Sequence, residues 1–226
     1  MVTGTARIAS ARTEVVKFKP SRKPQTSRHR GQMIALEPSE LIRLLEVSRK
    51  HSVRDWAMLL TAYCHGLRAS EICNLRLEDV NLQGGSIHCK RLKGSLESIQ
   101  ALSPHRGNPL LDEVRALKTW LKVRKDDGSG YLFLSSKGGA LTRIQFFRLF
   151  QKYAEAAGLP PAKRHPHTLK HALASHLVAE NTNLAIVQIA LGHRAISSTM
   201  KYVTITGQQT DEARQQTFMK IFSSAR

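Results

Sequence analysis

Apolar residues recur at helical spacing through most of this chain, and this periodicity restricts its possible folds more than any other feature. Leu41, Leu44 and Leu45 follow the spacing i, i+3, i+4, which places their side chains on one helix face. A hydrophobic content of 41% is enough for a globular core. Helices with one apolar face are predicted in the same way at 56–63, 114–121, 146–153, 168–179, 183–191 and 210–222.

One stretch, Asn81 to Leu102, departs from the helical spacing. Gly84 and Gly85 are a turn signal, and residues 86–91 and 98–102 are expected to form short strands around a loop at 92–97. The next sheet-like segment is Tyr-Leu-Phe-Leu at 131–134. We therefore expect a mainly α fold with a small β-sheet or hairpin on one side.

The first residues differ from the rest in composition. Residues 1–31 hold eight Lys and Arg against the single acid Glu14, and Pro20 and Pro24 oppose a packed core. We predict a flexible basic arm over residues 1–32, which either lies along nucleic acid or remains a solvated tail. The side chains expected to contact DNA in the first case are Arg22, Lys23, Arg28 and Arg30.

The formal net charge is +18, from 35 Lys and Arg against 17 Asp and Glu. Such an excess bears on partners rather than on fold, and it favours nucleic acid or an anionic membrane surface. No apolar run approaches the ~20 residues of a membrane-spanning helix, and no apolar N-terminal segment indicates a secretion signal. The charge therefore leaves nucleic acid and an anionic surface open as partners, and no membrane-spanning segment is expected.

The cysteine pattern indicates a reducing compartment. Cys64, Cys73 and Cys89 are an odd number without CxxC spacing, which does not fit a disulfide framework. We expect them to be small buried hydrophobic residues of a cytoplasmic protein.

Polar side chains recur inside apolar sequence in the last third of the chain. His167, Lys170 and His171 are spaced i, i+3, i+4 and so share one helix face, with Pro166 suited to the first turn. A helix N-terminus with nearby cations is a ready site for an anion such as phosphate. A metal site that includes His165 is the alternative, but no carboxylate or cysteine lies nearby in the sequence, so no metal is expected.

Tyr202 is a candidate nucleophile for the same phosphate. A phenol that attacks phosphorus forms a covalent phosphotyrosine and conserves the bond energy, so neither ATP nor another cofactor is needed. The charge that develops on the phosphate oxygens requires fixed donors. The residues that can supply them are Arg68, His167, Lys170 and His193.

The order of these residues resembles the tyrosine recombinase (phage integrase) family over about residues 35–205. The matching segments are Gly66-Leu-Arg68-Ala-Ser-Glu71, His165-Pro-His167-Thr-Leu-Lys170-His171, Leu191-Gly-His193-Arg194 and Tyr202. The segments His65 to Arg76 and Arg91-Leu-Lys93 are similar to those of the short bacterial recombinases that invert fimbrial promoters.

The resemblance implies a role for each residue of the site. Tyr202 would attack the scissile phosphate and leave a 3′-phosphotyrosine with a free 5′-hydroxyl. Arg68 and Lys170 would clamp the phosphate, His193 would donate to it, and His167 would act as general base.

Other residues would act around that centre. Lys93, rather than Lys90, would protonate the leaving 5′-oxygen, and Glu71 would orient the cations. Arg143, at the start of a predicted helix, would contact a DNA groove or face solvent, and Arg164 would lie beside the phosphate site.

The resemblance also implies the larger assembly. Residues 33–205 would form the catalytic domain with the tyrosine recombinase fold, and 206–226 a C-terminal helix that docks on a neighbouring protomer. A protein that is a monomer or weak oligomer when free would form a homotetramer on a specific DNA site and exchange strands through a Holliday junction. Such a protein is bacterial or phage-encoded and associated with the nucleoid.

Two departures from the family pattern leave alternatives open. Lys170 stands where the family has its second arginine, so the charge is kept but the planar, bidentate geometry is lost. The residues before the first predicted helix are too few for the family's upstream DNA-binding domain. Besides an active recombinase, the sequence therefore allows a non-catalytic DNA-binding protein of the same fold, or a type IB topoisomerase.

Overall fold

The structure is a computed structural model that describes residues 34–92, 94–203 and 207–223. The helices are α1 (Pro38–His51), α2 (Val53–Cys64), α3 (Ala69–Cys73), α4 (Glu113–Val123), α5 (Arg143–Ala156), α6 (His167–Ala179), α7 (Leu184–Ala190) and α8 (Gly207–Ser223). The strands are β1 (Val80–Asn81), β2 (Ser86–Cys89) and β3 (Ser98–Ala101). Short 3₁₀ turns lie at η1 (Leu77–Asp79), η2 (Pro161–Lys163), η3 (Ile196–Ser198) and η4 (Met200–Tyr202). The prediction of a mainly α fold with a small sheet is confirmed.

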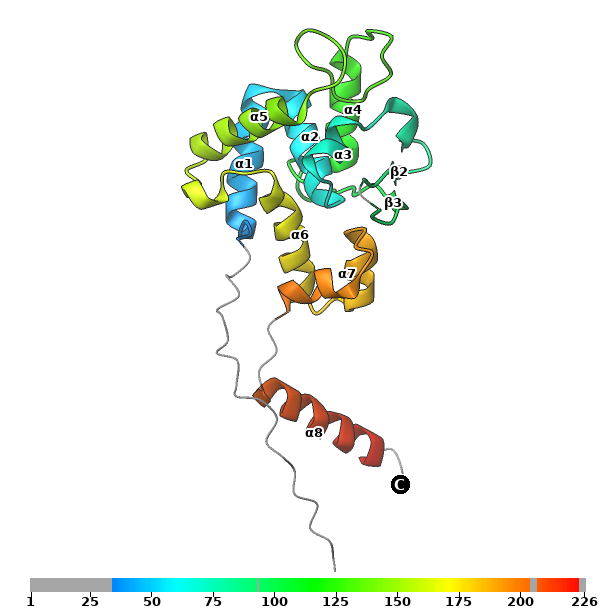
Figure 1. Cartoon of the computed structure of the whole chain (residues 1–226), viewed down its shortest axis with the longest axis vertical. Coiled ribbons are helices and arrows are strands. Elements are labelled where there is room, and N and C mark those ends of the chain that lie inside the picture. Colours follow the sequence, from blue (N-terminus) through cyan, green and yellow to red (C-terminus); the bar gives the residue numbers. More distant parts are fainter. Residues whose placement is uncertain (1–33, 93, 204–206, 224–226) are drawn as a thin grey trace, which may run out of the picture. The chain divides into compact units, whose positions relative to one another are not determined.

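Helix α2 is the centre of the core. Ser52 caps its first turn by accepting a hydrogen bond from the Asp55 backbone amide. Every residue from Trp56 to Ala62 is buried, because α2 packs against α1, α4 and α6 (Figure 1). In α1 only the predicted apolar stripe of Leu41, Leu44 and Leu45 is buried together with Ser48, as expected for a helix at the surface of a core.

The small sheet is antiparallel, with the strand order β1-β2-β3. The two predicted strands pair with Ile87 opposite Gln100 and His88 opposite Ile99, so the expected hairpin is confirmed. The prediction of a strand at 131–134 is wrong: Tyr131 and Leu134 each form an isolated bridge. This segment is buried by packing rather than by a ladder, since the Leu132 amide donates to the Leu75 carbonyl, 2.8 Å away.

A second, small apolar cluster lies under the last segments before α8. Ala174 of α6 and Val187 of α7 are buried together with Leu191, and Tyr202 packs against them. Asn183 caps α7 by accepting from the Ala185 amide. This cluster fixes the 3₁₀ turn that carries Tyr202 to α6, which carries His167 and His171, and to α7, which His193 follows.

The predicted last helix is present as α8. Phe218 and Ile221 are exposed on it, and the predicted apolar partner Phe222 has a side chain outside the described residues. Docking of this helix on a neighbouring protomer stays a prediction. The predicted arm, with Arg22, Lys23, Arg28 and Arg30, also lies outside the described residues. Within the described residues, none of the helices has the length and apolar character needed to cross a membrane.

Candidate active site

A left-handed turn brings Arg68 to the site. Helix α2 ends at Cys64, and Gly66 follows with a φ of +54°, where a Cβ atom would lie 2.9 Å from the Leu191 side chain. The chain then enters α3 with Arg68 as its N-cap. The Arg68 Nη1 atom donates to Glu71 Oε1 at 2.7 Å and to Ser95 Oγ at 2.9 Å, while 26% of the side chain stays exposed to a ligand.

Glu71 holds Arg68 from behind. Its buried carboxylate accepts hydrogen bonds from the Arg68 backbone amide at 2.8 Å and from the Leu92 amide at 3.2 Å, and Arg91 lies 3.3 Å away. Burial acts to raise the pKa of Glu71, but these hydrogen bonds and the charge of Arg91 outweigh it and lower the pKa. Glu71 is therefore an ionised acceptor for the two arginines.

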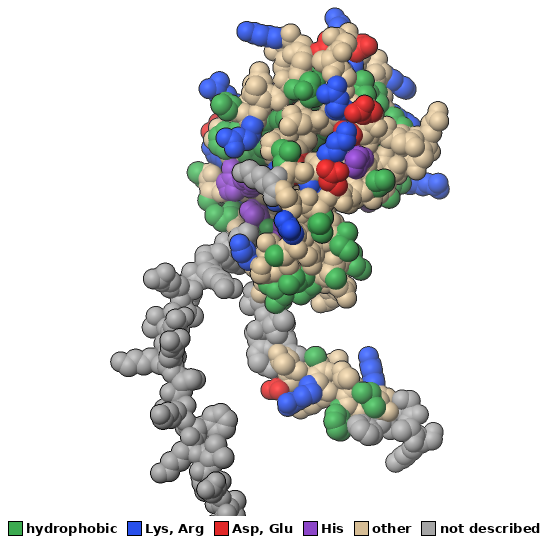
Figure 2. Space-filling view, turned by 45° about the vertical axis from the view of Figure 1, so that its right-hand side comes forward, with side chains coloured by type: hydrophobic (Ala, Val, Ile, Leu, Met, Phe, Trp, Pro, Cys, Tyr) green, Lys and Arg blue, Asp and Glu red, His purple; other side chains and the backbone are tan. Residues whose placement is uncertain are grey.

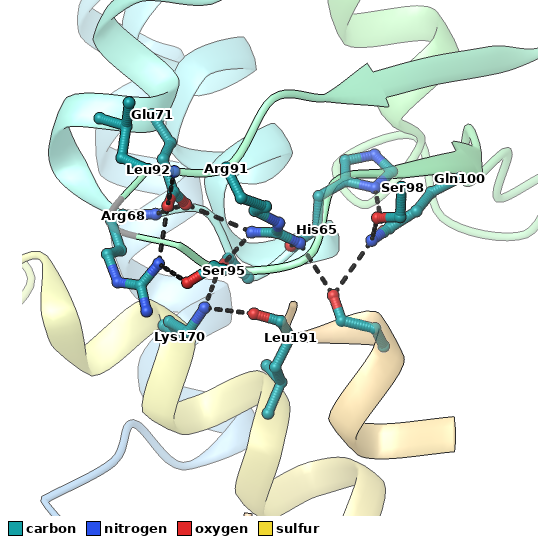
Figure 3. A network of polar contacts seen from close by, with 12 residues as sticks. His65, Arg68, Glu71, Arg91, Leu92, Ser95, Ser98, Gln100, Lys170 and Leu191 are labelled. Atoms are coloured by element: carbon teal, nitrogen blue, oxygen red, sulfur yellow. Dashed lines mark hydrogen bonds and ion pairs between the residues drawn. The ribbon is translucent and has the colours of Figure 1, made fainter. Parts of the chain in front are cut away.

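Lys170 lies in the interior rather than on an open phosphate-binding face. Its Nζ atom donates to the carbonyl oxygens of Gly66 at 2.9 Å and Leu191 at 2.6 Å, and the residue is only 5% exposed (Figure 3). Burial lowers the pKa of Lys170 to about 7, and the charges of Arg91 and Arg68 act in the same direction. The predicted phosphate clamp thus has two of its three donors engaged by the backbone.

Arg91 is the main residue that sequence reasoning missed. Its guanidinium is fully buried and donates to the carbonyl oxygens of His65 at 2.8 Å, Gly66 at 3.0 Å and Ala190 at 2.9 Å, besides Glu71 (Figure 3). One side chain therefore joins the turn before Arg68 to the end of α7. Its position in the quoted segment Arg91-Leu-Lys93 was the only signal in the sequence, because its partners are mostly backbone atoms.

His65 is a buried cation that directly precedes the Gly66 turn. Its Nε2 atom faces the Glu113 carboxylate at 2.9 Å and its Nδ1 atom faces Gln100 Oε1 at 2.8 Å. Gln100 Nε2 donates to the Ala190 carbonyl, which fixes the orientation of the amide. Both ring nitrogens thus meet acceptors. Although burial opposes it, the contacts with Cys89 and Glu113 raise the pKa of His65 to about 10.

Tyr202 lies between two histidines. Its hydroxyl oxygen is 2.7 Å from His171 Nδ1, and its ring stacks on the His193 ring with centroids 6.5 Å apart and planes 10° apart. His193 is buried, with Nδ1 3.0 Å from Thr199 Oγ1. Burial and neighbouring positive charges lower the pKa of both histidines to about 4, and burial raises the pKa of Tyr202 to about 12 despite Arg68.

His167 opens α6 and is more exposed than the other two histidines of the site. Its ring centroid is 6.3 Å from that of His171, and burial followed by the charges of His165 and Arg68 lowers its pKa. Figure 2 shows histidine side chains gathered on one face with lysine or arginine side chains close by. Within the described residues, no group of three or more His, Cys, Asp or Glu side chains is arranged to hold a metal ion.

The remaining predicted residues lie around this centre or outside the described part. Lys93 lies outside the described residues, but its neighbours are anchored: Leu92 to Glu71, as above, and Leu96 to the Gly192 carbonyl at 3.2 Å. Lys90 is paired with Asp79 at 2.7 Å and with Glu78 at 3.4 Å.

The two DNA-contact arginines differ in their surroundings. Arg143 is exposed at the start of α5, where Thr142 caps the helix. The Arg164 guanidinium is held by Glu155 and by the Leu159 carbonyl, both at 2.8 Å, so part of its donor capacity is used within the protein. Contact of either residue with DNA stays a prediction.

Known proteins are similar to this chain in sequence. The model of the phage integrase family matches residues 35–209. The tyrosine recombinase XerA of Pyrococcus furiosus is 33% identical over 182 residues, which are 79% of this chain and 60% of that protein. The type 1 fimbriae regulatory protein FimB of Escherichia coli K12 is 36% identical over 173 residues, 74% of this chain and 82% of its own. The chain thus spans less than two thirds of the length of XerA.

Solved structures agree on the fold. The crystal structure of XerA recombinase superposes with a TM-score of 0.66 at 24% identity, covering 88% of this chain and 66% of that one. The XerH site-specific recombinase bound to its difH substrate, in a pre-cleavage complex, gives a TM-score of 0.67 at 26% identity, over 81% of this chain and 54% of that one. The predicted tyrosine recombinase catalytic-domain fold is confirmed.

Proposed function

The chain belongs to the phage integrase family, and we propose that it is a site-specific DNA recombinase that cuts and rejoins DNA through a covalent 3′-phosphotyrosine at Tyr202. The observation that carries this proposal is the position of the Tyr202 hydroxyl, 2.7 Å from a neutral histidine and beside His193, on the same face as Arg68. The tyrosine recombinase names of the relatives support the same activity.

The phosphate would be held by the donors around Tyr202. Arg68 is already oriented by Glu71 and Ser95, and its remaining donors would bind the nonbridging oxygens. His193, fixed by Thr199, would donate to the same oxygens as charge develops on them. Attack by the Tyr202 oxygen would form the phosphorus–phenol bond while the bond to the 5′-oxygen breaks.

Lys93 would give a proton to the leaving 5′-oxygen. The anchoring of the loop on both sides of it, at Leu92 and at Ser95 and Leu96, supports a place for this loop beside Arg68. Lys90, the alternative general acid, forms ion pairs with Asp79 and Glu78 instead, which argues against this role for it. Lys170 would contribute its charge from the interior, close to the phosphate rather than in a bidentate contact with it.

The partner would be double-stranded DNA carrying a specific site. The net charge of +18 supports strong, salt-dependent contact with phosphates, and a homologous recombinase has been captured on its DNA substrate. We further infer a homotetramer on DNA, with strand exchange through a Holliday junction and with α8 docked on a neighbouring protomer. The exposed Phe218 and Ile221 of α8 support this last contact.

DNA binding without catalysis is the second function to test. It is favoured because Lys170 donates to the carbonyl oxygens of Gly66 and Leu191, which leaves fewer of its donors for a phosphate. A nicked suicide duplex separates the two functions. The site in the duplex is recovered from random DNA by binding selection with the full chain. Wild type is expected to form a covalent protein–DNA band that Tyr202→Phe lacks while it retains binding. No band from wild type, with binding retained, would establish the non-catalytic function.

A further inference from the structure

We propose that His171, and not His167, takes the phenolic proton of Tyr202 during DNA cleavage and returns it during rejoining. This inference rests on the proposed function, because it concerns the activation of the same tyrosine. His171 lies on α6, one helical turn beyond His167, and Tyr202 lies on η4.

The geometry separates the two histidines. A general base must lie within hydrogen-bond reach of the proton that it removes. His171 Nδ1 is 2.7 Å from the Tyr202 hydroxyl oxygen, whereas His167 has no hydrogen bond with Tyr202 among the described residues. The His167 ring is a neighbour of the His171 ring instead, with centroids 6.3 Å apart. Of these two histidines, His171 is the one in place to accept the proton directly.

The surroundings keep His171 in the form that accepts. Positive or titratable groups face it from its own helix and the preceding turn, namely His165, His167 and Lys170, and from the other side it faces Tyr202, with His193 beyond. Together with burial, the first three lower the pKa of His171 to about 4. The imidazole is therefore neutral near pH 7, and its tautomer with the proton on Nε2 presents the Nδ1 lone pair to the phenol.

Tyr202 needs such a base. Burial raises the pKa of its phenol to about 12, so the tyrosinate form is scarce near neutral pH. In the forward step, the Tyr202 oxygen bonds to phosphorus and the bond between phosphorus and the 5′-oxygen breaks. The phenolic proton moves to His171 Nδ1 to give an imidazolium, and the leaving 5′-oxygen takes a separate proton from the general acid of the proposed function, which makes it a 5′-hydroxyl. In the reverse step, the 5′-hydroxyl returns its proton to that general acid as it attacks phosphorus, and the departing phenolate recovers the proton from His171.

The test measures the rate of the covalent step with the leaving group simplified. Single-turnover cleavage is followed on a suicide duplex that carries a selected site and a sulfur in place of the bridging 5′-oxygen. A thiolate leaves without a proton, so any loss on this duplex concerns the nucleophile rather than Lys93. The proteins are wild type, His171→Ala, His171→Gln and Tyr202→Phe, with His167→Ala as the matched control from the same helix face.

Removal of His171 is expected to slow cleavage near neutral pH by on the order of 10²–10⁴-fold, the usual contribution of a general base. The rate of His171→Ala should then rise about tenfold per pH unit on the alkaline side, because only tyrosinate reacts, while wild type stays level above the pKa of His171. Incorporation of 3-fluorotyrosine at position 202, which has a more acidic phenol, should restore much of the His171→Ala rate. The loss in His167→Ala should stay level with pH and gain little from the fluorinated phenol.

Three outcomes would overturn the inference. The first is cleavage by His171→Ala and His171→Gln at the wild-type rate. The second is a loss in both variants that is independent of pH and of the fluorinated phenol, because a purely structural role would act in that way. The third is the alkaline rise and the fluorotyrosine rescue appearing in His167→Ala instead. Absence of an adduct from wild type would overturn the proposed function itself, and the inference with it.

Discussion

Replacement of Lys170 by methionine is expected to change how the stability of the protein depends on pH. Lys170 is 5% exposed and lies near Arg68 and Arg91, and its hydrogen-bond partners among the described residues are the carbonyl oxygens of Gly66 and Leu191. Methionine has a similar length but no charge. The substitution therefore removes the cost of burying the ammonium and leaves the rest of the site in place.

The magnitude follows from the pKa. The pKa of Lys170 falls from 10.5 in the unfolded chain to about 7 in the folded one, a difference of about 3.5 pH units. Between these values the unfolded chain holds a proton that the folded chain lacks, so the free energy of unfolding of wild type rises with pH by about 1.4 kcal/mol per unit. The total gain between pH 7 and pH 10.5 is at most about 5 kcal/mol.

Urea unfolding of both proteins at intervals between about pH 6 and pH 10 measures this effect. Titrating groups that do not interact with Lys170 cancel in the difference between the two free energies of unfolding, and His171 and His193, which do interact with it, have a pKa of about 4 in wild type, below the range of the measurement. The free energy of unfolding of wild type should rise steadily relative to that of Lys170→Met as the pH increases above 7. Below pH 7 the difference between the two proteins should be constant. A difference that is constant across the whole range would refute a depressed pKa for Lys170.

Other perturbations probe the supports of the site. Gly192→Ala should lower the free energy of unfolding by more than about 2 kcal/mol, because φ is +64° and a Cβ atom would lie 2.8 Å from Arg91 Nε. Gly85→Ala is the control, since Gly85 has the same φ with open space around it, and it should cost only about 1 kcal/mol. Equal costs for the two substitutions would contradict this account. Arg91→Met should lower the free energy of unfolding by about 3 kcal/mol, because it removes the donor to the His65 carbonyl oxygen and a buried cation from the Glu71 carboxylate. A loss below about 1 kcal/mol in urea unfolding would contradict the role of Arg91 in joining these segments. The affinity for DNA should fall steeply as the salt concentration rises. Each alanine substitution at an arm residue that contacts a phosphate should reduce the slope of log K against log salt concentration by about 0.9. An unchanged slope would show that the substituted residue does not contact the DNA. The arm residues to substitute are Arg22, Lys23, Arg28 and Arg30.

Much of the fold was accessible from the sequence because most of its helices have one apolar face. The stripe of Leu41, Leu44 and Leu45 and the glycine that ends α2 could be placed from local spacing alone. The segment at 131–134 shows the limit of such reasoning. Its four apolar residues are typical of a strand, but the neighbouring chain offers only single bridging residues, so it is held by packing instead.

The site divides in the same way. Residues that we propose to act directly on a phosphate, such as Arg68 and Tyr202, carry recognisable chemistry in an ordered set of motifs. Arg91 and His65 could not be assigned, because their roles depend on carbonyl and carboxylate groups that only the fold brings near. Sequence spacing also placed His167 and His171 on one face without showing which of them meets the tyrosine. That choice depends on how η4 packs on α6 and α7.

The most direct test of the central claim is mass spectrometry of the protein trapped on a suicide duplex. Trypsin cuts after Lys201 and Arg214, so Tyr202 lies at the start of the peptide 202–214 and is its only tyrosine. After nuclease digestion, this peptide is expected to carry the mass of a nucleotide linked through its 3′-phosphate to Tyr202. A trapped adduct on any other peptide, or cleavage of the duplex without a protein adduct, would contradict phosphotyrosine chemistry at Tyr202.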